Sequence, residues 1–291
     1  MSDSPGGQVV VGIDGSESAL AAARLAAREA ALHGRPLLLV HAFVWALLPV
    51  PLGPDPAGPP EGGFRHQAER VVAEAMREAR RAAPGVTVSA TIDDGSAAPV
   101  LLRHARHAAM LVLGDRGLDG FSGLLLGSIA VQAATHATCP VVVVRGQERP
   151  GGPVVVGVDG SEVSERAVAF AFDEAARRGV PLVAAHAWRY PTSTAPGDML
   201  PLVYDRDVPG TDEEVVLAQS IAGWRERYPE VSVIRRLRHG RPGSVLIEES
   251  AEAGLLVVGS RGRGGFTGLL LGSVSHAALH HAACPVAVVH R

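Results

Sequence analysis

Cysteine and net charge are both scarce in this chain. Its 291 residues include 2 cysteines and carry a formal net charge of −3. Two cysteines are too few for a disulfide framework, and so small a net charge excludes a basic nucleic-acid binder. Hydrophobic residues make up 47% of the chain, which excludes intrinsic disorder. Cys139 and Cys284 each precede a Pro and a Val-rich run, so we expect both to be buried as small apolar residues.

Segments for export or membrane insertion are also lacking. The opening MSDSPGG has neither the basic nor the apolar region of a signal peptide. The most apolar windows are interrupted by His41, Pro49, Gln132 or His136, so none has the uninterrupted length of a membrane-spanning helix. We therefore expect a cytoplasmic protein with no membrane partner.

One fifteen-residue segment occurs twice. Residues 114–128 read GDRGLDGFSGLLLGS, and 145 positions later residues 259–273 read GSRGRGGFTGLLLGS. Eleven of the fifteen positions are identical, including every glycine of the frame G-x2-G-x9-G-S. Glycines let backbone N–H groups approach an anion closely and permit positive φ, and the apolar run predicts a helix whose N-terminus faces that anion. The chain is therefore predicted to hold two phosphate-binding sites.

The same offset relates the rest of the two halves. It pairs the Asp-Gly-Ser of residues 14–16 with that of residues 159–161, and Cys139 with Cys284. A repeat of this length indicates two tandem domains rather than a solenoid. We expect one domain at residues 1–146 and the other at 153–291, joined through a polar stretch rich in Gly and Pro.

Each half alternates short Val, Ile and Leu runs with Ala-rich segments of helical period, which is typical of a parallel sheet covered on both faces. Strands are predicted near residues 8–13, 36–42, 86–92, 109–114 and 140–145, and near 153–158, 180–187, 231–237, 254–259 and 285–290. Helices are predicted near 17–33, 64–82, 97–108 and 125–137, and near 162–178, 211–228, 243–253 and 270–282. The fold class is therefore α/β, with two tandem Rossmann-like domains, each a five-stranded parallel sheet sandwiched by four helices. Ser16 and Ser161 are predicted to cap the first helix of their domains.

Sheets of this kind bind ligands at the carboxyl ends of their strands, where the strand order reverses. In each half the first strand ends at an aspartate, Asp14 or Asp159, and the fourth strand leads directly into the glycine loop. These aspartates are predicted to lie where a ribose hydroxyl or a purine edge is bound. His41 and His186 end the second strands, and we expect them to make structural hydrogen bonds rather than to transfer protons, because no nucleophile or second base accompanies them.

The glycine loop differs from the better known phosphate loops. It lacks the Lys of a Walker A loop, and it does not follow the first strand as the dinucleotide loop G-x-G-x-x-G does. Together with the openings VVVGIDGS and VVVGVDGS and the closing CPVVVV and CPVAVV, it resembles the universal stress protein family in its tandem, ATP-binding form. The resemblance covers both halves almost end to end. It implies an adenine nucleotide α-hydrolase-like fold and bound ATP, with Mg²⁺.

The resemblance also implies which residues contact the nucleotide. The ends of the first strands lie beside it, the backbone after the second strands contacts adenine, and the loops and following helix starts wrap ribose and phosphates. The residues concerned are Gly12, Ile13, Asp14, Ala42, Gly114, Arg116, Gly117, Gly127, Ser128 and Ile129, and in the second half Gly157, Val158, Asp159, Ala187, Gly259, Arg261, Gly262, Gly272, Ser273 and Val274. No catalytic residue and no metal-ligating residue is predicted. The leucines at 124–126 and 269–271 are expected to pack rather than to contact a ligand, and His276, His280 and His281 to lie on an ordinary helix, since no Cys or carboxylate accompanies them.

The two loops differ in charge at one position, where Asp115 corresponds to Ser260. A carboxylate near a polyphosphate weakens its binding unless a cation intervenes. The second site is therefore expected to bind at least as tightly as the first. The difference disappears if the Asp115 side chain points away from the ligand.

Three functions are compatible with these features. The favoured one is an ATP-binding stress or regulatory protein in which nucleotide occupancy of one or both clefts controls conformation or association. The strands at 140–145 and 285–290 are candidates for edge pairing between domains or between the chains of a homodimer, and an unidentified protein partner is also compatible. The alternatives are a slow ATPase or adenylyl-transferring enzyme of the same fold group, and a scaffold that uses no nucleotide. The lack of a Walker B-type acidic strand and of a water-activating base favours binding without efficient turnover.

Overall fold

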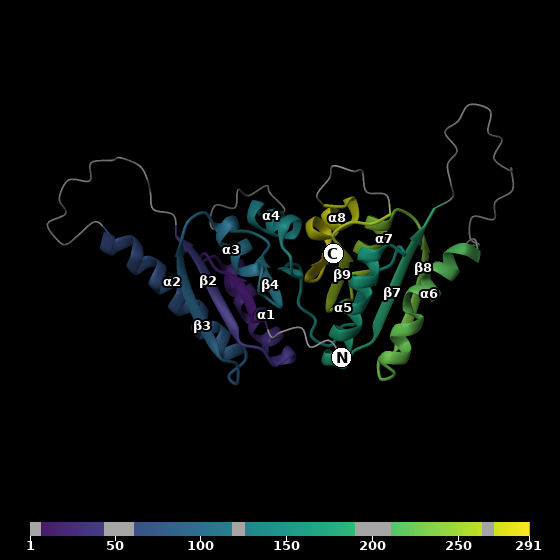
Figure 1. Cartoon of the computed structure of the whole chain (residues 1–291), viewed down its shortest axis with the longest axis horizontal. Coiled ribbons are helices and arrows are strands. Elements are labelled where there is room, and N and C mark those ends of the chain that lie inside the picture. Colours follow the sequence, from purple (N-terminus) through teal and green to yellow (C-terminus); the bar gives the residue numbers. More distant parts are fainter. Residues whose placement is uncertain (1–6, 44–60, 118–125, 190–210, 264–270, 291) are drawn as a thin grey trace, which may run out of the picture. The chain divides into compact units, whose positions relative to one another are not determined.

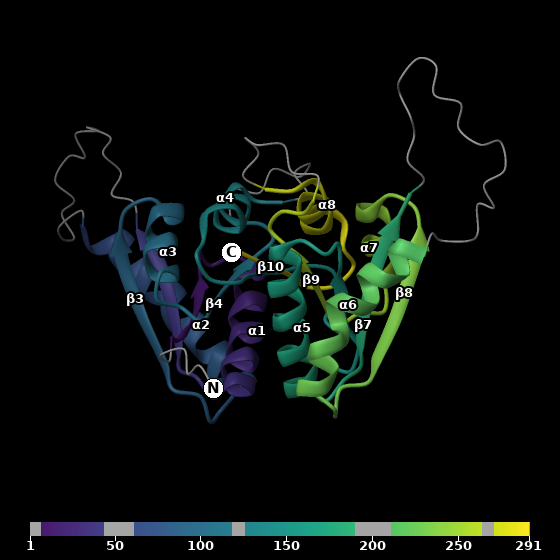
Figure 2. The ribbon, with the colours of Figure 1, turned by 45° about the vertical axis from the view of Figure 1, so that its right-hand side comes forward.

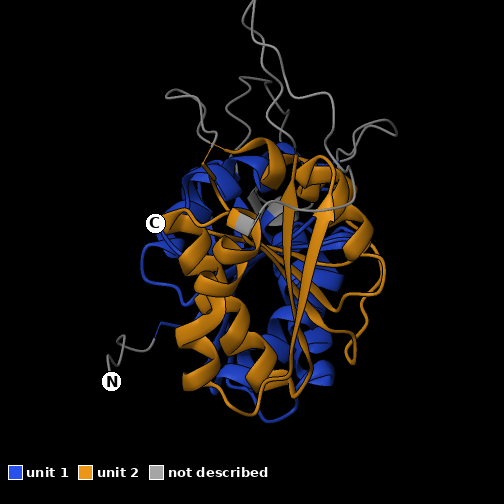
Figure 3. Cartoon of the chain, turned by 90° about the vertical axis from the view of Figure 1, so that its right-hand side faces the viewer, with its two compact units in different colours: residues 1–145 blue, residues 146–291 orange. Residues whose placement is uncertain are grey.

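The computed structural model describes residues 7–43, 61–117, 126–189, 211–263 and 271–290 (Figure 1). The chain divides into two compact units, Met1–Arg145 and Gly146–Arg291, which Figure 3 shows in different colours. The exact domain limits expected from the sequence stay a prediction.

The first unit is a parallel sheet with the strand order β3-β2-β1-β4-β5. Its helices α1 and α2 pack against each other, and so do α3 and α4 (Figures 1 and 2). In chain order its elements are β1 (Val9–Gly12), α1 (Glu17–His33), β2 (Leu37–Phe43), α2 (Glu61–Ala82), β3 (Val88–Asp94), α3 (Ala97–Ala105), β4 (Met110–Gly114), α4 (Ser128–His136) and β5 (Val141–Val144).

The second unit repeats this arrangement with the order β10-β9-β6-β7-β8, again with every pairing parallel. Its elements are β6 (Val154–Gly157), α5 (Glu162–Arg178), β7 (Leu182–Trp188), α6 (Thr211–Arg227), β8 (Val233–His239), α7 (Pro242–Glu249), β9 (Leu255–Gly259), α8 (Ser273–His281) and β10 (Val286–Val289). The predicted fold class is confirmed: two tandem Rossmann-like domains, each with five parallel strands and four helices in the part of the chain that the structure describes.

Sequence features at the helix ends account for where α1 and α5 begin and stop. The hydroxyl of Ser16 accepts a hydrogen bond from the N–H of Ala19 at 3.1 Å, and that of Ser161 accepts one from Ser164 at 3.2 Å. These are the predicted caps. Both helices end at a glycine in the left-handed region: Gly34 follows α1 with φ 61°, and Gly179 follows α5 with φ 63°. The first helices therefore match their predicted limits, 17–33 and 162–178.

The helix after each glycine loop starts later than predicted. Gly127 is the extended N-cap residue of α4, with φ −73° and ψ 146°, and Gly272 is that of α8. The apolar residues before these glycines had suggested starts near residues 125 and 270. Both of those positions lie outside the described residues.

The core consists of the central strands and the Ala-rich helix faces that cover them. All four residues of β5 are buried, as are the three valines of β1, because both faces of the sheet are covered. Cys139 is 5% exposed and Cys284 is fully buried, so the expectation that both cysteines are buried is confirmed. In the described part of the chain, no helix combines the length and apolarity needed to span a bilayer.

The strand order reverses between β1 and β4. From β1 the chain moves outward through β2 to β3, and then returns to place β4 on the other side of β1. The same reversal lies between β6 and β9. At such a point the connections leave in opposite directions and open a crevice at the carboxyl ends of the strands.

Candidate functional site

A cavity occupies this crevice in each unit, with a volume of about 470 Å³ in the first and about 480 Å³ in the second. Every residue predicted to contact a nucleotide lines one of the two cavities. The first is lined by Gly12, Ile13, Asp14, Ala42, Gly114, Arg116, Gly117, Gly127, Ser128 and Ile129, and the second by Gly157, Val158, Asp159, Ala187, Gly259, Arg261, Gly262, Gly272, Ser273 and Val274. The structure thus brings together residues that lie up to 117 positions apart in the chain, such as Gly12 and Ile129. Their role as ligand contacts stays a prediction.

A tight turn after the first strand holds each cavity aspartate. Oδ1 of Asp14 accepts a hydrogen bond from the N–H of Ser16 at 2.9 Å, and Oδ1 of Asp159 accepts one from Ser161 at the same distance. The intervening glycines have φ of 92° and 72°, which a residue with a side chain rarely adopts. The Asp-Gly-Ser sequence therefore fixes the carboxylate at the cavity as well as capping the helix.

Hydrogen bonds close the two ends of each glycine loop onto each other. The N–H of Gly127 donates to the carbonyl of Asp115 at 2.7 Å, and the N–H of Gly272 donates to that of Ser260 at 2.8 Å. The residues between, 118–125 and 264–270, lie outside the described residues. The closure places the start of α4 or α8 beside the end of the fourth strand of its unit.

The helix starts present backbone donors to the cavities. Gly127 and Gly272 make no side-chain cap hydrogen bond, because they have no side chain. The first N–H groups of a helix have no acceptor within the helix, and the first helical residues, Ser128 and Ser273, line the cavities. Together with the helix dipole, these groups make a favourable environment for an anion.

The apolar wall of each cavity includes residues that were not predicted. Leu101 on α3 and Leu246 on α7 line equivalent positions, 145 residues apart, and so do Leu126 and Leu271. Leu126 is 5% exposed and packs in the core, as expected, and it also lines the cavity, as Leu271 does in the second unit. Whether either leucine contacts a ligand stays a prediction, and the other loop leucines lie outside the described residues. In a sequence, an apolar helix residue that borders a cavity looks the same as one that packs in the core. The repeat was therefore the only feature of the sequence that could have pointed to these lining residues.

Asp115 does not line the cavity of the first unit. Its side chain is 17% exposed and lies 3.6 Å from Nε of Arg116, and Oδ1 accepts a hydrogen bond from the hydroxyl of Ser18 at 2.7 Å. The carboxylate is thus directed to α1 rather than to the cavity, so the expected direct repulsion between Asp115 and a bound phosphate is removed. Arg116, which pairs with this carboxylate, does line the cavity.

The histidines at the ends of the second strands make structural hydrogen bonds. Nδ1 of His41 lies 2.9 Å from the carbonyl of Ile13, and Nδ1 of His186 lies 2.6 Å from that of Val158. Since a carbonyl only accepts, each Nδ1 is the donor. His186 also lies 2.8 Å from the carboxylate of Glu213 on α6. Neither histidine lines either of the two cavities, and the predicted structural hydrogen bonds are present.

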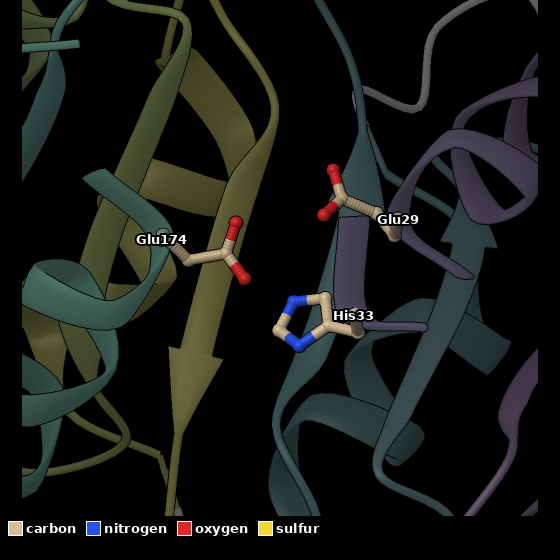
Figure 4. Close-up of side chains that lie close together, drawn as sticks. All are labelled: Glu29, His33 and Glu174. Atoms are coloured by element: carbon tan, nitrogen blue, oxygen red, sulfur yellow. The ribbon is translucent and has the colours of Figure 1, made fainter. Parts of the chain in front are cut away.

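Some charged residues are buried away from the cavities. Glu29 on α1 and Glu174 on α5 occupy equivalent positions of the repeat and are 1% and 0% exposed. Within the second unit Glu174 pairs with Arg178, one turn further along α5, at 2.9 Å. The corresponding residue of α1 is His33 (Figure 4). None of these residues lines either cavity.

Two doubly wound domains with equivalent strand-edge cavities define a tandem Rossmann-like α/β protein. The sequence model of the universal stress protein family matches residues 7–145 and again residues 152–290. A universal stress protein of Mycolicibacterium smegmatis is 42% identical over 291 residues, which span 97% of this chain and 96% of that protein. One of Mycobacterium tuberculosis is 41% identical over 291 residues, spanning 96% and 95%. The chain belongs to the universal stress protein family, as its motifs predicted.

Solved structures agree with the fold. A universal stress protein from Archaeoglobus fulgidus matches with a TM-score of 0.72 at 18% identity, over 97% of this chain and 98% of that one. A protein from Pseudomonas aeruginosa described as a putative universal stress protein matches with a TM-score of 0.62 at 15% identity, over 98% of this chain and 93% of that one. At these identities the likeness concerns the fold alone.

Proposed function

We propose that each cavity binds an adenine nucleotide, ATP with Mg²⁺, and that occupancy of one or both cavities controls the conformation or association state of the chain. The proposal is supported above all by one observation: the same ten positions of the repeat line a cavity in both units. Both cavities fall within the range of about 300–1,000 Å³ that is typical of small-molecule sites.

Different parts of each cavity wall suit the base, the ribose and the phosphates of a nucleotide. The apolar part, with Ala42 and Leu101 in the first unit and Ala187 and Leu246 in the second, suits the faces of a purine. The carboxylate of Asp14 or Asp159 accepts hydrogen bonds from ribose hydroxyls. The start of α4 or α8 and the loop arginine face the phosphates.

In this proposal the Mg²⁺ ion is bound mainly by the phosphate groups of the nucleotide. Asp14 and Asp159 are the only carboxylates among the described residues that line the cavities. A magnesium ion bound with a nucleotide needs only one or two carboxylates, because phosphate oxygens and waters complete its shell. When bound, the ion would neutralise part of the phosphate charge, and phosphate oxygens and waters would hold it, because the proposal assigns the aspartate of each cavity to the ribose.

Binding without efficient turnover fits the lining residues. Among the described residues of the two linings there is no His, Glu or Lys. Positioning and activating a water for phosphoryl transfer requires a group of that kind in addition to the one that meets the ribose.

Calorimetric titration of nucleotide-stripped protein with Mg-ATP tests the proposal. We expect about two sites per chain if each crevice binds one ligand independently. Light scattering before and after saturation then tests whether occupancy changes the association state, with the homodimer as the expected assembly. Absence of binding would overturn the proposal in favour of a scaffold, and multiple-turnover release of ADP or pyrophosphate would favour an enzyme.

A further inference from the structure

We infer that the two cavities select for different numbers of phosphate groups: the second prefers a nucleoside triphosphate, whereas the first distinguishes little between a triphosphate and a monophosphate. This inference rests on the proposed function, since it concerns what the same two cavities bind. It is carried by the charged residues around each crevice.

The linings carry different formal charges. Among the described residues, the charged side chains that line the first cavity are those of Asp14 and Arg116, whose charges cancel. The described charged residues that line the second cavity are Asp159, Arg261 and Arg263, which leave one net positive charge. Because the base and ribose of a mono- and a triphosphate are the same, a difference in cavity charge acts mainly on the phosphate chain.

The loop arginines also differ in what surrounds them. Nε of Arg116 lies 3.6 Å from the carboxylate of Asp115, which compensates part of its charge. Arg261 is preceded instead by Ser260, a neutral residue that is 5% exposed. Among the described residues, no ion pair includes Arg261 or Arg263. Asp115 does not line the first cavity, and it acts on bound phosphates by compensating part of the charge of Arg116.

Arg263 is held at the second cavity by its backbone and its side chain. Its N–H donates to Oδ2 of Asp159 at 2.9 Å. Its guanidinium lies against Gly160, where an added Cβ would overlap Nη2. The arginine therefore covers the turn that carries the cavity aspartate. The corresponding residue of the first repeat is Leu118, which is uncharged and lies outside the described residues.

The consequence is a difference in selectivity rather than only in affinity. Each further phosphate adds negative charge that the second cavity attracts and the first does not. We expect the ratio of ATP affinity to AMP affinity to be about tenfold or more higher in the second cavity, because charges at a cleft act on the added phosphate charge even when they are partly screened. Higher salt should reduce the difference, since it screens exposed charges.

Titrations of ATP, ADP and AMP without Mg²⁺ test the inference in chains with one working cavity. Gly262→Ala leaves the first cavity intact, and Gly117→Ala leaves the second. Arg263→Leu, which gives the second repeat the residue of the first, should lower the ATP to AMP ratio of the second cavity. Arg166→Leu is the matched control, since Arg166 is an exposed arginine that pairs with Glu162 on α5 and lies outside both linings.

A second test exchanges the residues at positions 115 and 260 in a chain that keeps both cavities functional. Asp115→Ser should raise ATP affinity at the first cavity with little change for AMP, and Ser260→Asp should do the opposite at the second. Equal ATP to AMP ratios in the two cavities, unchanged by the exchanges, would overturn the inference and leave the proposed function standing. No binding of any of the three nucleotides at either cavity, with or without Mg²⁺, would overturn the proposed function itself.

Discussion

Gly117 lies against the carboxylate of Asp14, so that a Cβ on residue 117 would come within 2.7 Å of Oδ2. In the second unit an added Cβ on Gly262 would overlap Oδ2 of Asp159. Neither glycine has a positive φ, so neither is required for its backbone conformation. What each provides is room for the aspartate side chain. In each unit the loop after the fourth strand thus packs closely against the turn after the first strand, at Oδ2 of the aspartate.

Replacing both glycines by alanine should therefore impair binding more than folding. The added methyl displaces the end of a side chain and not backbone, so we expect the free energy of unfolding to change by less than about 1 kcal/mol. The displaced carboxylate no longer meets the ligand, and ATP affinity should fall by about tenfold or more, which corresponds to about 1.4 kcal/mol. Calorimetry and urea denaturation of Gly117→Ala with Gly262→Ala measure the two effects.

The control is a pair of glycines with free space around them. A Cβ on Gly85 or on Gly223 would meet no atom within 4 Å, so Gly85→Ala with Gly223→Ala should bind ATP as the parent chain does. Unchanged ATP affinity in the loop variant would contradict the assignment of the loop to the site.

The aspartates give a prediction about the sugar. If Asp14 and Asp159 accept hydrogen bonds from ribose hydroxyls, their replacement by alanine should weaken ATP binding by about tenfold to a hundredfold, since a hydrogen bond to a charged group contributes about 1.5–3 kcal/mol. The same variants should lose little affinity for 2′,3′-dideoxy-ATP, which lacks those hydroxyls. Titrating both ligands against the parent and Asp14→Ala with Asp159→Ala completes the thermodynamic cycle. Equal losses for the two ligands would mean that the carboxylates do not contact the ribose.

The sequence predicted most of what is local in this fold and in its cavities. The capping serines, the strand-end aspartates and the glycine frame are encoded in short segments, and the repeat placed each of them twice. The direction of the Asp115 carboxylate was not predictable, because it depends on Ser18, which lies 97 positions earlier in the chain. Leu101 and Leu246 were missed for a similar reason: their contribution to a cavity depends on how α3 and α7 pack over the sheets. Positions fixed by tertiary contacts between distant segments have no signature in one sequence.

Thiol reactivity should follow burial. Burial raises the pKa of the Cys139 thiol to about 12, and the thiolate is the form that reacts with disulfide reagents. Cys284 is fully buried. We expect no rapid reaction with an aromatic disulfide reagent in the native chain at about pH 8 and reaction of both thiols once guanidinium chloride unfolds it. Fast labelling of one thiol in the native chain would indicate that its unit opens locally.

Asp93 connects β3 to α3 and gives the first unit a specific sensitivity to acid. Its carboxylate accepts hydrogen bonds from the Thr91 hydroxyl at 2.6 Å, from His104 at 2.9 Å and from Arg103 at 2.8 Å. These bonds, that from Thr91 foremost, lower the pKa of Asp93 from 3.8 to about 2. Because the folded state binds this proton less readily than the unfolded state, the ionised carboxylate stabilises the fold above about pH 4. That contribution is lost as the pH falls toward 2.

Asp93→Asn should accordingly lower the free energy of unfolding at neutral pH by about 1–2 kcal/mol, since the amide makes weaker hydrogen bonds with Arg103 and His104 than the carboxylate does. The deficit relative to the parent chain should shrink between pH 4 and pH 2, where the parent loses the same interaction. Urea denaturation at neutral pH and near the acid end of that range measures it, with the exposed neighbour Asp94→Asn as the matched control. A deficit that stays constant across the range would mean that the substitution acts through packing rather than through the charge of Asp93.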